Sequence, residues 1–210
     1  MCRLLCVKSE THFPISHYLK ELAHISKNSQ EFQGHGWGYA LYNESKWELY
    51  HKIKPIWEDS LDVAPEGTIL LAHARSAFEN KNIKVENNMP FQSGNYAYIF
   101  NGELRGVRIH EQGRIGAEKL FNFIKRFDNG SIKEAMSTGL AQIEKRTKYI
   151  KAFNMIVAND SHVHLVSRFN ENPAYYTLHK KSENGMTVIS SEPFGDISNW
   201  SEIPQGVHQV

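Results

Sequence analysis

The stretch Met1-Cys2-Arg3-Leu4-Leu5 places a thiol directly behind a methionine and starts an apolar run that predicts a buried strand over residues 1–7. If Met1 is removed, Cys2 becomes the terminal residue and carries a nucleophile and a base on one amino acid. A free α-amino group titrates near about 8 and a thiol near about 8.5, so the amine can accept the thiol proton at neutral pH. The alternative is a structural cysteine that packs as a small apolar side chain.

The composition is that of one globular domain over residues 1–210. The chain is 40% hydrophobic and 11% aromatic, which is enough to bury a sizeable core. Its 24 basic and 23 acidic side chains are interspersed, so no basic stripe predicts a nucleic-acid partner. No apolar run approaches the about 20 residues that span a bilayer, and the first apolar stretch ends at Lys8, too early for a signal peptide. Cys2 and Cys6 are too close in sequence to staple a fold, which favours a reducing, cytoplasmic location.

Hydrophobic periodicity predicts an α+β architecture. Apolar residues recur at helical spacing in 15–26, 117–127 and 132–146. Strands come before and after the two central helices, an order that indicates layered sheets with helices outside rather than a doubly wound parallel sheet. The expected strands are residues 1–7, 37–42, 47–53, 68–74, 96–100, 103–109, 153–158, 162–169, 175–179 and 187–191.

Two segments carry candidate binding residues. In Gly34-His35-Gly36-Trp37-Gly38, the glycines let a backbone close over a small ligand, which makes Gly36 and Trp37 candidates; the alternative is a flexible loop or bulge. In His73-Ala74-Arg75-Ser76, the residues end a strand, where side chains project into a cleft. There Arg75 offers a planar fork for a substrate carboxylate, or else a surface ion pair. His73 is a candidate base, although an N-terminal amine makes one unnecessary.

The dipeptide Asn101-Gly102 has two interpretations that are compatible with each other. Between two apolar runs it is a strong hairpin signal. It also supplies a side-chain amide and an unobstructed backbone N–H, the donors of an oxyanion hole. His162 and His164 share a strand face without an evident third ligand, so the sequence predicts no metal site and no cofactor.

Taken together, these segments resemble the class II glutamine amidotransferases, the N-terminal-cysteine branch of the N-terminal nucleophile (Ntn) hydrolases, in their compact stand-alone form. Six segments match in the family's order and cover essentially the whole chain: Met1-Cys2-Arg3-Leu4-Leu5, Gly34-His35-Gly36-Trp37-Gly38, His73-Ala74-Arg75, Asn88-Met89-Pro90-Phe91, Phe100-Asn101-Gly102-Glu103-Leu104 and Ser190-Ser191-Glu192-Pro193-Phe194.

The resemblance implies a four-layer αββα sandwich with the nucleophile at the cleft between two antiparallel sheets. It implies that Cys2 attacks a γ-carboxamide and forms a γ-glutamyl thioester, with release of ammonia or an amine before water frees glutamate. It further implies that Arg75 binds the substrate α-carboxylate and that Asn101 and Gly102 form the oxyanion hole.

The chain departs from the family at the start of the helix after Asn101-Gly102. Gly116 stands where relatives carry the aspartate that binds the substrate α-ammonium, and Glu118 or Glu111 is a candidate replacement. Met89 and Phe100 replace two histidines of the family and make the cleft less polar. Because a buried ammonium without a carboxylate partner is costly, the alternative is a substrate other than plain glutamine.

Two other functions compete with an amide hydrolase. The first is an inactive Ntn fold that holds a small carboxylate through Arg75 and regulates a partner. The second is a redox protein that uses Cys2 and Cys6, which an alternating strand places on one face. An ammonia-transferring enzyme would also need a separate synthase or ligase partner.

Overall fold

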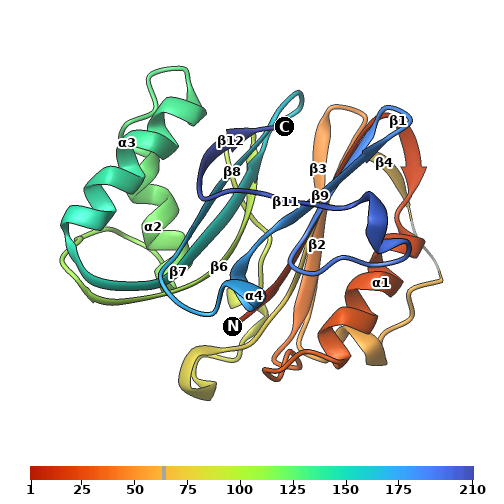
Figure 1. The fold of residues 1–210 in the computed structure, drawn as a ribbon, viewed down its shortest axis with the longest axis horizontal. Coiled ribbons are helices and arrows are strands. Elements are labelled where there is room, and N and C mark those ends of the chain that lie inside the picture. The colour runs from red at the N-terminus through yellow and green to blue at the C-terminus, as the bar shows by residue number, and fades with distance from the viewer. Residues whose placement is uncertain (63–64) are drawn as a thin grey trace.

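The computed structural model describes residues 1–62 and 65–210, which form two antiparallel sheets stacked face to face with helices on the outer sides (Figure 1). The larger sheet runs through β11 (Ser201–Glu202), β9 (His179–Glu183), β10 (Met186–Ser190), β1 (Arg3–Pro14), β4 (Glu66–Ala74), β2 (Trp37–Asn43) and β3 (Lys46–Lys52). The smaller sheet runs through β12 (Gly206–Gln209), β8 (Val163–Phe169), β7 (Thr147–Ala158), β6 (Tyr96–Val107) and β5 (Phe91–Ser93).

Helices cover the outer face of each sheet. α1 (Ser16–Lys27) lies over the larger sheet, and α2 (Gly116–Lys125) and α3 (Ile132–Lys145) lie over the smaller one (Figure 1). The layered α+β sandwich predicted from the sequence is therefore confirmed. The short elements are α4 (Pro173–Tyr176), η1 (Ile56–Glu58), η2 (Phe78–Asn80), η3 (Val85–Asn87) and η4 (Ile197–Asn199).

The alternation of side chains along β1 separates two cores. Leu4 and Cys6 point into the core between the sheets, whereas Leu5 and Val7 point into the core under α1. Cys2 lies two residues before Leu4, on the side of the larger sheet that faces the smaller one. Figure 1 shows the N-terminus between the two sheets, near α4.

The helices are short and amphipathic. α3 begins at a capped turn, because the Ser131 side chain accepts a hydrogen bond from the Glu134 N–H. Its buried residues recur at helical spacing: Ile132, Ala135, Met136, Gly139, Leu140 and Ile143. Among residues 1–62 and 65–210, no helix has both the length and the apolar character that crossing a bilayer requires.

The hairpin expected at Asn101-Gly102 is wrong. Strand β6 runs without a turn from Tyr96 to Val107, and Asn101 and Gly102 pair with Asn154 and Phe153 of β7. The chain instead bends at a register shift between Glu103 and Leu104. Pairing with the long strand β7 outweighs the local turn preference of an Asn-Gly pair.

The strand expected over residues 175–179 is also wrong. Residues 173–176 form the short helix α4, with Pro173 at its first turn, and the strand starts only at His179. The helix buries Tyr175 and Tyr176 beside Ala152, so packing against the smaller sheet decides the local conformation.

Candidate active site

Cys2 lies where the two sheets meet, and its side chain is buried. Its backbone nitrogen donates a hydrogen bond to Asn101 Oδ1 over 2.8 Å, which links the start of β1 to the middle of β6. Its Sγ accepts from the Ser76 N–H at 3.4 Å. Burial raises the pKa of the thiol, and the nearby terminal ammonium, the Ser76 hydrogen bond and Arg75 act in the opposite direction. The ionisation of this thiol therefore depends on neighbouring positive charge.

Asn101 and Gly102 lie side by side in β6, at the point where Asn101 contacts Cys2. Because Asn101 Oδ1 accepts from the Cys2 nitrogen, its Nδ2 group is left as a donor on the Cys2 side of the strand. A Cβ atom at Gly102 would lie 2.4 Å from the Ala152 carbonyl oxygen and 2.4 Å from the Phe100 ring. Close packing therefore requires glycine at this position. The pair has the make-up of an oxyanion hole next to a thiol.

Arg75 is a buried cation that follows the end of β4. Its Nη1 donates to Asn88 Oδ1 at 3.2 Å, and its Nη2 donates to the Asn82 carbonyl at 2.9 Å. Both partners are neutral, and no acidic side chain in residues 1–62 and 65–210 forms an ion pair with it. A buried guanidinium without a counter-ion favours an anionic ligand. This is the arrangement expected of a carboxylate-binding arginine.

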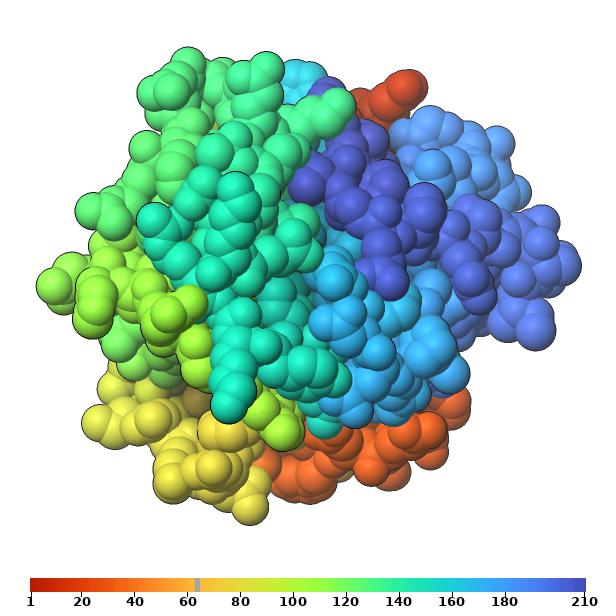
Figure 2. Space-filling model, turned by 60° about the vertical axis from the view of Figure 1, so that its left-hand side comes forward, coloured from red at the N-terminus to blue at the C-terminus, as the bar shows by residue number. Residues whose placement is uncertain are grey.

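Gly36 allows Asn88 to reach Arg75. Its φ of +120° is a left-handed conformation, and a Cβ atom there would lie 2.1 Å from Asn88 Nδ2. The Gly36 carbonyl also accepts from the Arg75 N–H at 2.9 Å. The glycine-rich segment therefore supports Arg75 rather than forming a free loop. Figure 2 shows the yellow segment that follows Arg75 projecting from the lower edge of the molecule.

The Trp37 side chain does not reach the candidate site. It begins β2 and points into the core under α1, where its Nε1 donates to Asp59 at 3.1 Å. Residues of the same parity along β2 point away from the smaller sheet, and so away from Cys2.

His73 lies between the sheets as a neutral, structural imidazole. Its Nε2 lies 3.3 Å from the Phe100 carbonyl oxygen, to which only an N–H can donate, and no partner for Nδ1 exists among the described residues. Complete burial, together with the Arg75 charge, lowers its pKa to about 3. His73 therefore joins the larger sheet to the residue before Asn101 and is unsuited to act as a general base near neutral pH.

The two carboxylates considered for ammonium binding are engaged elsewhere. Glu118 forms an ion pair with Arg114 at 2.7 Å, and the Arg114 hydrogen bonds lower its carboxyl pKa. Glu111 lies 3.5 Å from Arg126. Gly116 is exposed, and a Cβ atom there would meet nothing within 4 Å.

Three residues that the sequence did not single out surround Met1. The Met1 ammonium pairs with Glu31, and the Met1 carbonyl accepts from Gln33 Nε2 at 2.6 Å and from the Tyr175 hydroxyl at 2.7 Å. Glu31 and Gln33 belong to the connection between α1 and β2, and Tyr175 belongs to α4. No local motif marks these positions, because the contacts join segments that are far apart in the sequence.

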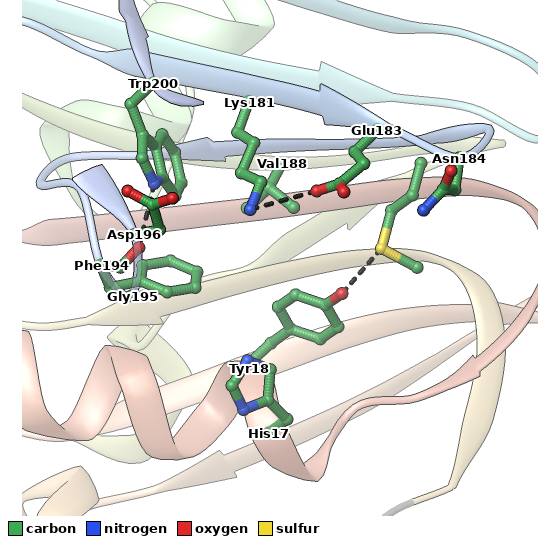
Figure 3. Close-up of a pocket in the computed structure, with 11 residues that line it drawn as sticks. His17, Tyr18, Lys181, Glu183, Asn184, Val188, Phe194, Gly195, Asp196 and Trp200 are labelled. Atoms are coloured by element: carbon green, nitrogen blue, oxygen red, sulfur yellow. Dashed lines mark hydrogen bonds and ion pairs between the residues drawn. The ribbon is translucent and has the colours of Figure 1, made fainter. Parts of the chain in front are cut away.

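Cys2 does not line either of two cavities on the surface. One of ≈ 310 Å³ opens beside α1 and the β9–β10 hairpin (Figure 3), and its Lys181 and Glu183 pair with each other at 3.3 Å. None of the sequence-predicted site residues lines it. The other, of ≈ 420 Å³, is lined by Arg3, Tyr175 and Glu192, among others, and Arg3 and Glu192 pair at 3.1 Å. Across the described ranges, no group of His, Cys, Asp and Glu side chains is arranged to hold a metal ion.

Comparison of the sequence with family models and with curated proteins gives no match. Solved structures do match. Glutamine phosphoribosylpyrophosphate amidotransferase from B. subtilis has a TM-score of 0.70 at 16% identity and covers 100% of this chain, which spans only 49% of that enzyme. A glutamine aminotransferase class-II domain protein from Silicibacter pomeroyi has a TM-score of 0.66 at 15% identity and covers 100% of this chain and 98% of its own. A predicted glutamine amidotransferase from Pseudomonas aeruginosa has a TM-score of 0.60 at 14% identity, with coverage of 99% and 96%. The chain therefore has the fold of the class II glutamine amidotransferase domain.

Proposed function

We propose that this chain is an N-terminal-cysteine amidohydrolase of the glutaminase type, which cleaves γ-glutamyl amides. The observation that carries the proposal is the 2.8 Å hydrogen bond from the Cys2 nitrogen to Asn101 Oδ1, which joins the residue that bears the thiol to Asn101. Once Met1 is removed, this nitrogen becomes the α-amine, so base, nucleophile and oxyanion donor are held within one set of contacts.

The proposed reaction begins when the Cys2 amine takes the thiol proton. The thiolate attacks the γ-carbonyl carbon, and the negative oxygen receives hydrogen bonds from Asn101 Nδ2 and the Gly102 N–H. The C–N bond then breaks, the amine delivers its proton to the leaving nitrogen, and a γ-glutamyl thioester remains. Water attacks the thioester with the same base, so that glutamate leaves and the thiol is restored.

Arg75 holds the substrate through its α-carboxylate in this proposal. Its two neutral partners, Asn88 and Asn82, leave the positive charge to the ligand. If ammonia is transferred rather than released, a separate synthase or ligase subunit receives it. Both cysteines are free thiols, which suits a reducing compartment such as the cytoplasm.

The experiment that tests this function uses purified protein whose N-terminus has been determined by intact mass. We expect protein that begins at Cys2 to release glutamate from at least one member of a panel of γ-glutamyl amides. Protein that binds glutamate through Arg75 but releases no amine from any amide would favour the inactive carboxylate-binding module. Full activity in protein that retains Met1 would refute the N-terminal amine as base.

Arg75→Lys is expected to raise KM about tenfold or more while the fold survives, because a point charge replaces a two-pronged grip on a carboxylate. The check is a cycle with a substrate analogue that lacks the α-carboxylate. The KM of wild type should rise by about the same factor when the analogue replaces the amide. The KM of the variant should rise little further with the analogue. If the two losses multiply instead, Arg75 does not contact the carboxylate.

A further inference from the structure

Glu31 is placed to bind an ammonium group beside the nucleophile. The structure already shows this interaction, because the α-ammonium of Met1 pairs with Glu31 Oε2. Met1 is the residue directly before Cys2. The Glu31 carboxylate therefore contacts the chain one residue away from the residue that bears the thiol. With its side chain 44% exposed, Glu31 is open to a ligand from solvent.

The buried side chain of Gln33 holds the segment that carries Glu31. Gln33 is fully buried, and its Nε2 lies within hydrogen-bond distance of the Glu31 carbonyl at 2.9 Å and of the Met1 carbonyl at 2.6 Å. The Tyr175 hydroxyl makes a second contact to the Met1 carbonyl. The Gln33 contact to the Glu31 carbonyl does not involve Met1, so it remains after Met1 is removed and holds the backbone that carries the carboxylate before a ligand arrives.

Groups of opposite charge belong to the segments that contact Cys2: Arg75 precedes Ser76, whose N–H donates to Cys2 Sγ, and Glu31 pairs with Met1, the residue before Cys2. Arg75 lowers the pKa of the Cys2 thiol and Glu31 raises it, so both charged groups lie close enough to act on the sulfur. The head group of a free α-amino acid carries one carboxylate and one ammonium. A cation with neutral partners and an anion whose present partner is removed with Met1 match these two charges.

The other two candidate carboxylates, Glu118 and Glu111, keep their arginine partners when Met1 is removed. Glu118 would have to give up its 2.7 Å ion pair with Arg114 to bind a substrate, and Glu111 already has a longer contact, 3.5 Å, with Arg126. The partner of Glu31 is lost by the same processing step that creates the nucleophile.

We propose that Glu31 binds the α-ammonium of the γ-glutamyl substrate, and that in the unprocessed chain the Met1 ammonium occupies this position. The inference rests on the proposed amide hydrolysis. It assigns the substrate class as γ-glutamyl amides with a free α-amino group, and it makes Met1 an internal competitor as well as a block on the amine.

The test compares two substrates across matched variants of protein that begins at Cys2. The substrates are L-glutamine, or the best amide of the panel, and the same amide without its α-amino group. Glu31→Gln keeps the size of the side chain and removes its charge. Glu118→Gln and Glu111→Gln make the same change at the rival carboxylates.

We expect Glu31→Gln to lower kcat/KM for the substrate with the amino group about tenfold, mainly through KM, and to change that for the des-amino amide less than about twofold. Glu118→Gln and Glu111→Gln should affect both substrates alike. Equal losses on both substrates in Glu31→Gln would overturn the inference and assign Glu31 to the Cys2 amine or to the fold. A selective loss in Glu118→Gln or Glu111→Gln would overturn it in favour of that residue. If correctly processed wild type hydrolyses neither substrate, the proposed function itself fails, and the inference with it.

Discussion

Cys2→Ser is expected to lower amide hydrolysis by about three orders of magnitude or more, the scale of losing a catalytic nucleophile. An alcohol ionises far less readily than a thiol, and the only base assigned to it is an amine. Serine is small enough to leave the contacts with Asn101 and Ser76 in place. Steady-state release of glutamate from a γ-glutamyl amide measures the loss.

Cys6→Ala is the matched control for this prediction. Cys6 points to the same side of β1, but it is buried in the core between the sheets, and burial raises its thiol pKa to about 12. Its removal should cost some stability and leave kcat within about twofold, because core substitutions act on folding rather than on the reacting atoms. Equal damage from the two substitutions would support a redox pair instead of a single nucleophile.

Asn101→Ala is expected to lower kcat about a hundredfold with KM nearly unchanged, which corresponds to about 3 kcal/mol of transition-state stabilisation. The reason is that the Nδ2 donor acts on the oxyanion and not on the bound amide. Melting temperature and kcat are measured on the same preparation, because the substitution also removes the hydrogen bond to the Cys2 nitrogen.

Asn154→Ala is the control for that measurement. Asn154 is the cross-strand partner of Asn101, is equally buried, and donates from Nδ2 to the Tyr176 carbonyl at 2.6 Å. Its removal should lower the melting temperature while kcat of the folded protein stays near that of wild type. Normal turnover in folded Asn101→Ala would show that Asn101 serves only the sheet.

The periodic parts of the fold were predictable from the sequence. The helical spacing in residues 117–127 and 132–146 gave α2 and α3 to within two residues at each end, because an amphipathic stripe depends on local order alone. The two errors have a common cause. Asn101-Gly102 has the local preference of a turn and residues 175–179 that of a strand, but pairing with β7 and packing against the smaller sheet override both.

The candidate site was predictable where a residue type points to a chemistry. Cys2, Arg75, Asn101 and Gly102 were singled out in this way; the fold brings Cys2 and Asn101 into direct contact and places Arg75 next to Ser76, whose N–H donates to the Cys2 thiol. Glu31 was not found, because a glutamate in a connecting segment has no distinguishing pattern. Its partner is Met1, and only the folded chain brings the two together. Trp37 is the reverse: the sequence indicated it as a binding residue, but its side chain points into the core under α1, although it follows Gly36 directly.

In the proposed reaction, Cys2 forms a γ-glutamyl thioester as the first residue of the processed chain. The most direct measurement is mass spectrometry of enzyme quenched in acid during turnover of a γ-glutamyl amide, followed by peptide mapping. We expect one added glutamyl group on the peptide that begins at Cys2, absent in Cys2→Ser and present in Cys6→Ala. An active preparation whose N-terminal peptide retains Met1, or an acyl group on any other residue, would contradict it.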